Sequence, residues 1–98
     1  TNVSPGRVLF SEFIKPLGLS QQELASDIGL SANHIAEIIS AKREIDADTA
    51  FRLALYFSTD EDFWMNLQMA YDLNMAKIRN GDEIVRTITP QKNKNSAS

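Results

Sequence analysis

Four residues between positions 32 and 37 have side chains that suit the edges of nucleic-acid bases: Ala32, Asn33, His34 and Glu37. In the major groove, an Asn amide can pair with adenine through two hydrogen bonds, and a carboxylate can accept from the cytosine amino group. An alanine methyl group can contact the thymine methyl group, and a histidine can donate to a base or a phosphate. These residue types predict base contacts if one helix presents them together.

Three further residues could bind the phosphates beside such a contact. Lys42 and Arg43 follow Glu37 closely, and Gln21 precedes Ala32 by eleven positions. Phosphate contacts fix the register of a protein on a duplex without reading its sequence. The alternative is a polar helix face that contacts only solvent, and a carboxylate there is repelled by phosphates unless a cytosine amine meets it.

A repeated tripeptide supplies the helices that these residues need. Gly-Leu-Ser occurs at residues 18–20 and 29–31, and each copy precedes a segment with apolar residues at helical spacing. Ser20 and Ser31 are typical N-caps, because a serine hydroxyl can accept from the unpaired N–H groups of a first helical turn. Glu23 completes a capping box with the first of them.

The turn between the two helices is also specified by the sequence. Gly29 lies where the first helix must end, and glycine takes the left-handed backbone conformation at little cost. The predicted helices span about residues 21–28 and 32–41, which makes a helix-turn-helix. Ile35 and Ile38 mark the buried side of the second helix, so the polar side chains face outward. In DNA-binding examples, the N-terminal residues of this helix reach base edges.

Two more helices are predicted on either side of this motif. Ser4 can cap a first helix that begins at Pro5, and Pro16 disfavours helical conformation at Lys15. Asp46 can cap a fourth helix, in which apolar residues recur at helical spacing.

A fifth helix is predicted from a cap at Ser58 or Thr59 to about Arg79, with the acidic residues 60–62 in its first turn. It has two apolar stripes. We interpret one as the core side and the other as a dimer or partner interface, where adaptable methionines are favoured; the alternative is that both are core. The interface stripe consists of Met65, Met69 and Leu73.

The remaining residues are predicted to form no further helix. Residues 80–82, Asn-Gly-Asp, are a turn signal, and residues 83–89 are rich in β-branched residues, which predicts a short strand or extended arm. Disorder is expected from Gln91 onward, because the composition is polar and small. The predicted organisation is a helix-turn-helix domain over 4–79 and a C-terminal arm over 80–98, extended and then disordered.

Composition limits the other possibilities. The chain has 98 residues, no cysteine, and a net charge of −3, which argues mildly against non-specific coating of nucleic acid. With one histidine and no thiolate, we expect neither a metal site nor another cofactor. Five short helices rarely provide a catalytic pocket, so no enzymatic activity is expected. No apolar run is long enough to span a bilayer and no signal-peptide pattern is present, so we expect a single cytoplasmic domain.

The sequence resembles HigA-type antitoxins, within the Cro/repressor-like helix-turn-helix superfamily, in three successive blocks: SPGRVLFSEFIKPLGLSQQELASDIGLS, EIISAKREIDADTAFRLALYF and FWMNLQMAYDLNMAK. The resemblance spans roughly Ser4 to Lys77 and implies an all-α, five-helix fold. Many members have glycine where this chain has Ala41. In that family the base-reading positions correspond to Ala32, Asn33, His34 and Glu37, with Gln21, Lys42 and Arg43 near phosphates.

The resemblance implies a homodimeric autorepressor that binds operator DNA and neutralises a cognate toxin, usually a messenger RNA endonuclease. The alternative is a protein-interaction module that keeps the helix-turn-helix fold but does not bind DNA, as the acidic balance and Glu37 permit. Binding to DNA from the region upstream of its own gene distinguishes the two functions.

Overall fold

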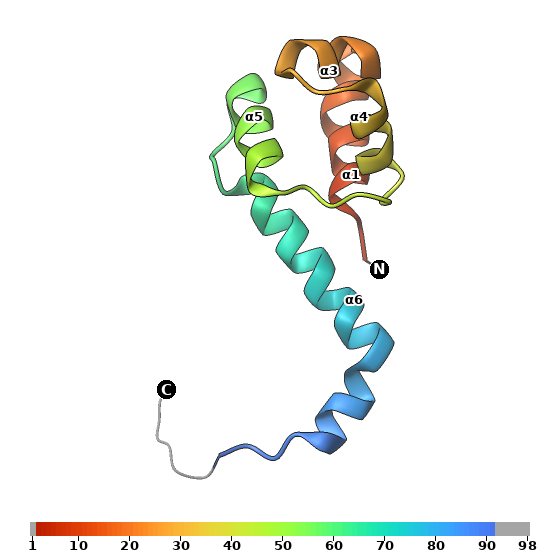
Figure 1. Cartoon of the computed structure of the whole chain (residues 1–98), viewed down its shortest axis with the longest axis vertical. Helices are drawn as coiled ribbons and strands as arrows, with labels where there is room; N and C mark the ends of the chain where they lie inside the picture. Colours follow the sequence, from red (N-terminus) through yellow and green to blue (C-terminus); the bar gives the residue numbers. More distant parts are fainter. Residues whose placement is uncertain (1, 92–98) are drawn as a thin grey trace.

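The computed structural model describes residues 2–91, and every regular element among them is helical (Figure 1). The first helical segment runs without a break through α1 (Pro5–Val8), a π-helical turn η1 (Leu9–Ile14) and α2 (Lys15–Leu17). It is followed by α3 (Gln21–Ile28), α4 (Ala32–Ile39), α5 (Ala47–Phe57) and α6 (Phe63–Thr87). The predicted all-α fold, with five helical segments and a helix-turn-helix, is confirmed for the described residues.

Side-chain caps start four of these segments at the residues that the sequence indicates. The side chains of Ser4, Ser31 and Asp46 each accept from the backbone N–H three residues further on. Ser20 and Glu23 form the complete capping box: the Glu23 N–H donates to Ser20 Oγ at 2.9 Å, and the Ser20 N–H donates to the Glu23 carboxylate at 3.3 Å. Because each cap is worth about 1 kcal/mol, these helix starts are fixed locally.

The first helix does not end before Pro16 as predicted. Lys15 is helical, with φ −64° and ψ −49°, and the helix continues to Leu17. In a regular α-helix, the proline ring would meet the carbonyl group four residues earlier. Here a wider π-helical turn precedes Pro16, and within it the Lys15 N–H donates to the carbonyl oxygen of Phe10. Gly18, with φ 67°, ends the helix instead.

The beginning of α6 also differs from the prediction. The helix starts at Phe63 after the N-cap residue Asp62, which makes no side-chain capping hydrogen bond. Ser58 instead ends α5 in the left-handed conformation, with φ 58°. Neither Ser58 nor Thr59 therefore caps α6, and residues 60–62 precede the helix rather than forming its first turn.

The end of α6 is a third correction. The helix passes through the predicted turn at residues 80–82 and continues to Thr87, so the predicted extended segment at 83–89 is wrong over most of its length. Residues 88–91 are not helical. The disorder predicted from Gln91 onward falls, apart from Gln91 itself, on residues 92–98, outside the described part.

The core lies between the five helical segments and is built around Trp64. This side chain is fully buried, and its Nε1 donates to Thr59 Oγ1 at 3.0 Å. The ring of Phe13 lies with its centroid 4.9 Å from that of Trp64 and 4.8 Å from that of Phe57, which joins the first helix to α5 and α6. Beyond the packed helices, α6 projects away from the core, and the molecule is 53 Å long (Figure 1).

Candidate nucleic-acid interface

Helix α4 presents a polar side to solvent because its apolar side is fixed in the core. Ile35 and Ile38 are buried, whereas Asn33 is exposed and Glu37 is half-buried. The helix begins where Ser31 Oγ accepts from the His34 N–H at 3.0 Å, shortly after α3 has ended in its left-handed glycine. Two local features therefore set the angle at which the polar side leaves the molecule.

A backbone contact supports α4 from behind. A Cβ atom added at Gly6 of α1 would overlap the carbonyl oxygen of Ile38 and lie 2.7 Å from the Cα atom of Ile39. Only glycine allows two backbones to approach this closely. The first helix is thus a rigid support for the C-terminal end of α4.

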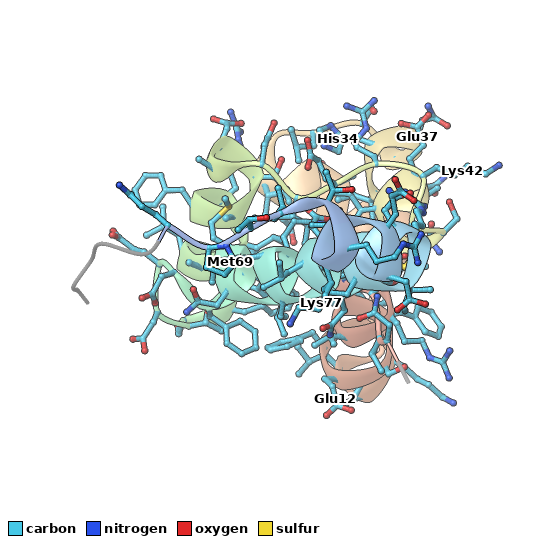
Figure 2. The ribbon with its side chains drawn as sticks, turned by 90° about the horizontal axis from the view of Figure 1, so that it is seen from below. Glu12, His34, Glu37, Lys42, Met69 and Lys77 are labelled. Carbon is cyan, nitrogen blue, oxygen red and sulfur yellow. The ribbon has the colours of Figure 1, made fainter. Side chains whose placement is uncertain are left out.

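Ala32 and His34 lie at the edge of the polar side and are half-buried. His34 Nε2 is 3.5 Å from Oγ1 of Thr49, a buried residue of α5, so the imidazole ring lies at the junction of α4 and α5. Figure 2 places His34, Glu37 and Lys42 along one edge of the molecule, with Glu12 at the opposite edge. Of the four predicted base-contacting residues, Asn33 is the most open to a partner.

The Glu37 carboxylate makes the densest set of polar contacts on this side. Its Oε1 accepts from Arg43 Nε at 2.8 Å and lies 2.7 Å from Arg43 Nη2 in an ion pair, and its Oε2 accepts from Asn33 Nδ2 at 3.3 Å. The hydrogen bond from Arg43 holds the pKa of Glu37 below its ordinary value, and the Arg43 charge and Asn33 add to this effect. Arg43, predicted to meet a phosphate, is therefore paired with a carboxylate in the unbound chain.

The other two predicted phosphate contacts lie outside α4. Lys42 is exposed just beyond the helix and makes no ion pair within the described part of the chain. Gln21 is the first residue of α3 and is half-buried. The structure thus brings His34, Glu37 and Lys42 to one side of the molecule, with Asn33 and Arg43 in contact with Glu37.

Two residues that position this side were not predicted from the sequence. Ala41 takes the left-handed conformation, with φ 64°, and the next N–H group, that of Lys42, donates to the Glu37 carbonyl oxygen at 2.8 Å. Gln68 is buried, and its Oε1 accepts from the Ile45 N–H at 2.8 Å, which ties the segment after α4 to α6. A polar residue on the core side of α6, one turn after the tryptophan, was the signal that could have identified Gln68.

The second apolar stripe of α6 is exposed. The exposed fractions of Met65, Met69 and Leu73 are 37%, 63% and 55%. The alternative that both stripes belong to the core is therefore wrong. Together with residues 44–47, the stripe lines an open groove of about 750 Å³.

Residues 2–91 contain no group of three or more His, Asp or Glu side chains that could hold a metal ion. None of the helices in this range is long and apolar enough to cross a membrane.

A capped pair of helices with a polar outer side, inside a five-helix bundle, defines a helix-turn-helix protein of the Cro/repressor type. Residues 11–64 match the family model described as Helix-turn-helix. The chain is 47% identical over 75 residues to virulence-associated protein I of Dichelobacter nodosus. This match covers 76% of this chain and 69% of that protein. It is 34% identical over 71 residues to antitoxin HigA-1 of Vibrio cholerae, and this match covers 72% of this chain and 67% of that protein.

A solved structure is similar over almost the whole described chain. The antitoxin HigA of Pseudomonas aeruginosa, solved with the higBA promoter, superposes with a TM-score of 0.89 and 39% sequence identity, covering 92% of this chain and 98% of that one. The chain belongs to the HigA-type antitoxins within the helix-turn-helix family. This is a class of antitoxins and transcription regulators, which are not enzymes.

Proposed function

We propose that the chain is an antitoxin that binds operator DNA as a homodimer, represses its own gene and neutralises a cognate mRNA-endonuclease toxin. The observation that carries DNA binding is the exposed polar side of α4, with Asn33 at its N-terminal end and Lys42 beyond its other end. This part of a helix-turn-helix meets base edges in DNA-binding proteins. Likeness to an antitoxin solved with its promoter supports the same use here.

We assign base contacts and phosphate contacts as the sequence suggested them. The base contacts are Ala32, Asn33, His34 and Glu37, and the phosphate contacts are Gln21, Lys42 and Arg43. Asn33 is the residue best suited to discriminate, because its amide is exposed and can pair with adenine through two hydrogen bonds.

Asn33→Ala tests this assignment in a mobility-shift titration on the DNA upstream of the gene. The variant should lose about tenfold or more of the preference for that DNA over an unrelated duplex, because a bidentate base contact supplies about 1–3 kcal/mol of discrimination. Asn80→Ala is the matched control, since it removes an exposed amide from α6 far along the chain. An unchanged preference in Asn33→Ala would remove this residue from recognition. If the wild-type chain binds no DNA even at low salt, the protein-interaction module is the correct function.

We propose that the exposed stripe of α6 is the homodimer interface. An exposed row of large apolar side chains on a small domain marks a surface that another protein covers. The charges favour a second copy: residues 60–62, just before α6, are acidic, and Lys77 and Arg79 lie further along α6 itself. Two antiparallel copies of α6, crossing near Met69, would bring the acidic end of each to the level of the basic residues of the other.

The antitoxin activity is tested by co-expression with the adjacent reading frame. We expect that frame to be toxic alone and harmless together with this chain. Continued toxicity despite soluble expression of both proteins would contradict neutralisation without affecting the DNA-binding assignment.

A further inference from the structure

The side chains of Asn33, Glu37 and Arg43 form one connected array on the outer side of α4. Arg43 Nε donates to one oxygen of the Glu37 carboxylate at 2.8 Å, Nη2 of Arg43 lies 2.7 Å from the same oxygen in the ion pair, and Asn33 donates to the other oxygen at 3.3 Å. Charge-assisted hydrogen bonds of this length are the stronger kind. The carboxylate is thus held from both ends before any DNA arrives.

The backbone strengthens this arrangement. The N–H groups of Lys42 and Arg43 donate to the Glu37 carbonyl oxygen at 2.8 Å and 3.2 Å, and the Ser40 hydroxyl donates to the same atom at 3.2 Å. The loop that carries Arg43 is therefore anchored on the residue whose side chain it contacts. Because both ends of the ion pair are attached to one fixed segment, little freedom is lost when it forms.

The array stays accessible to a ligand. The side chains of Arg43 and Glu37 are 46% and 35% exposed, and Asn33 is exposed as well. Each carboxylate oxygen can accept more than one hydrogen bond, and Nη1 of Arg43 makes no hydrogen bond within residues 2–91. The array therefore offers acceptors beside a donor, which is the pattern complementary to the cytosine amino group and the guanine O6 and N7 atoms.

We propose that Glu37 and Arg43, with Asn33 holding the second carboxylate oxygen, act as a preorganised unit that reads a C·G base pair: Arg43 positions the Glu37 carboxylate for the cytosine amino group and presents Nη1 to the guanine. This inference rests on the proposed DNA binding and replaces the assignment of Arg43 to a phosphate. If the guanidinium of Arg43 turned away to a phosphate instead, the Glu37 carboxylate would face the DNA backbone without its counter-charge. Kept together, the two charges cancel locally, so Glu37 can approach the duplex without repulsion.

The test compares the two roles of Arg43 by fluorescence anisotropy at several salt concentrations. The probes are the upstream DNA, the same DNA with each C·G pair replaced in turn by T·A, and an unrelated duplex. The wild type should prefer C·G at one position by about 5- to 100-fold. Arg43→Lys keeps the charge but loses the planar fork, and it should abolish this preference while leaving binding to the unrelated duplex and the salt slope unchanged. Glu37→Gln should abolish the preference at the same base pair.

Lys42→Met and Arg43→Met form the matched pair of charge removals. Lys42 makes no ion pair in the described chain, so its loss should weaken binding to all duplexes equally and reduce the salt slope by about one. Arg43→Met should instead remove the C·G preference.

If Arg43→Met behaves like Lys42→Met and the C·G preference survives, Arg43 is a phosphate contact and the inference is overturned. Circular dichroism establishes that each variant is folded. If the wild type binds the upstream DNA but no C·G pair depends on Glu37, only this inference fails. If it binds no DNA at all, the proposed function fails with it.

Discussion

Ala41 has a backbone conformation that its own Cβ atom disfavours. Its φ of 64° turns the chain back so that Lys42 and Arg43 can donate to the carbonyl oxygen of Glu37. This conformation costs a non-glycine residue about 1–2 kcal/mol. Glycine avoids that cost but loses more chain entropy on folding, which offsets part of the gain. Ala41→Gly should therefore raise the free energy of unfolding by about 1 kcal/mol, measured by urea denaturation.

The control for this substitution is Ala36→Gly, which makes the same chemical change within α4. Ala36 is exposed and has helical surroundings, so glycine there should lower the free energy of unfolding by about 1 kcal/mol. Destabilisation by both substitutions would show that Ala41 is not strained.

At the residue scale, the sequence predicted the contacts that depend only on neighbours along the chain. Ser20 and Ser31 cap their helices as expected, because an N-cap needs nothing beyond its own first turn. The pairing of Arg43 with Glu37 and the placement of His34 beside Thr49 were not predicted. Both depend on side-chain conformations or on elements that approach only in the folded molecule.

At the scale of elements, the contact between α1 and α4 allows no side chain. Gly6→Ala would place a methyl group against the carbonyl oxygen of Ile38, and backbone cannot move aside as a flexible side chain can. The substitution should lower the free energy of unfolding by about 3 kcal/mol. Gly81→Ala is the opposite case: the nearest atom to the new methyl group is 3.8 Å away, so stability should rise by about 0.5–1 kcal/mol.

Thermal or urea denaturation of both glycine variants measures these changes. Equal small effects at the two positions would contradict a close backbone contact at Gly6. Because this contact supports α4, Gly6→Ala should also weaken DNA binding, whereas Gly81→Ala should not.

Two of the three errors in element boundaries have a common cause. Pro16 and Gly81 each disfavour a helix locally, yet the helix continues past both. Extending a helix that is already formed costs little per residue, whereas starting one is unfavourable. In α6 the anchored Trp64 provides the start, and the exposed ion pair between Arg86 and Glu83 lies near the end. Local residue preferences alone therefore underestimate helices that are held in place elsewhere.

For the whole molecule, the length of α6 changes the organisation expected from the sequence. The boundary proposed between residues 79 and 80 falls inside one helix, so the residues beyond it continue the element that carries Trp64. The exposed stripe lies between this anchored part and the projecting part. In a dimer formed by an antiparallel pair of α6 helices, each copy would contribute one α4. Dimeric helix-turn-helix proteins use two such helices to read half-sites about 34 Å apart.

Met69→Glu tests this assembly, because an axis near Met69 would bring the two introduced carboxylates together. Like charges facing each other cost several kcal/mol at an interface, so the dimer should dissociate at least about 100-fold more readily in sedimentation equilibrium. Ala70→Glu adds the same charge at the next exposed position, about 100° around the helix, and should leave the dimer intact. The Met69→Glu monomer should keep its helix content but lose most of its operator affinity, because one recognition helix contacts only one half-site. If Met69→Glu remains as dimeric as the wild type, the two copies meet through another surface.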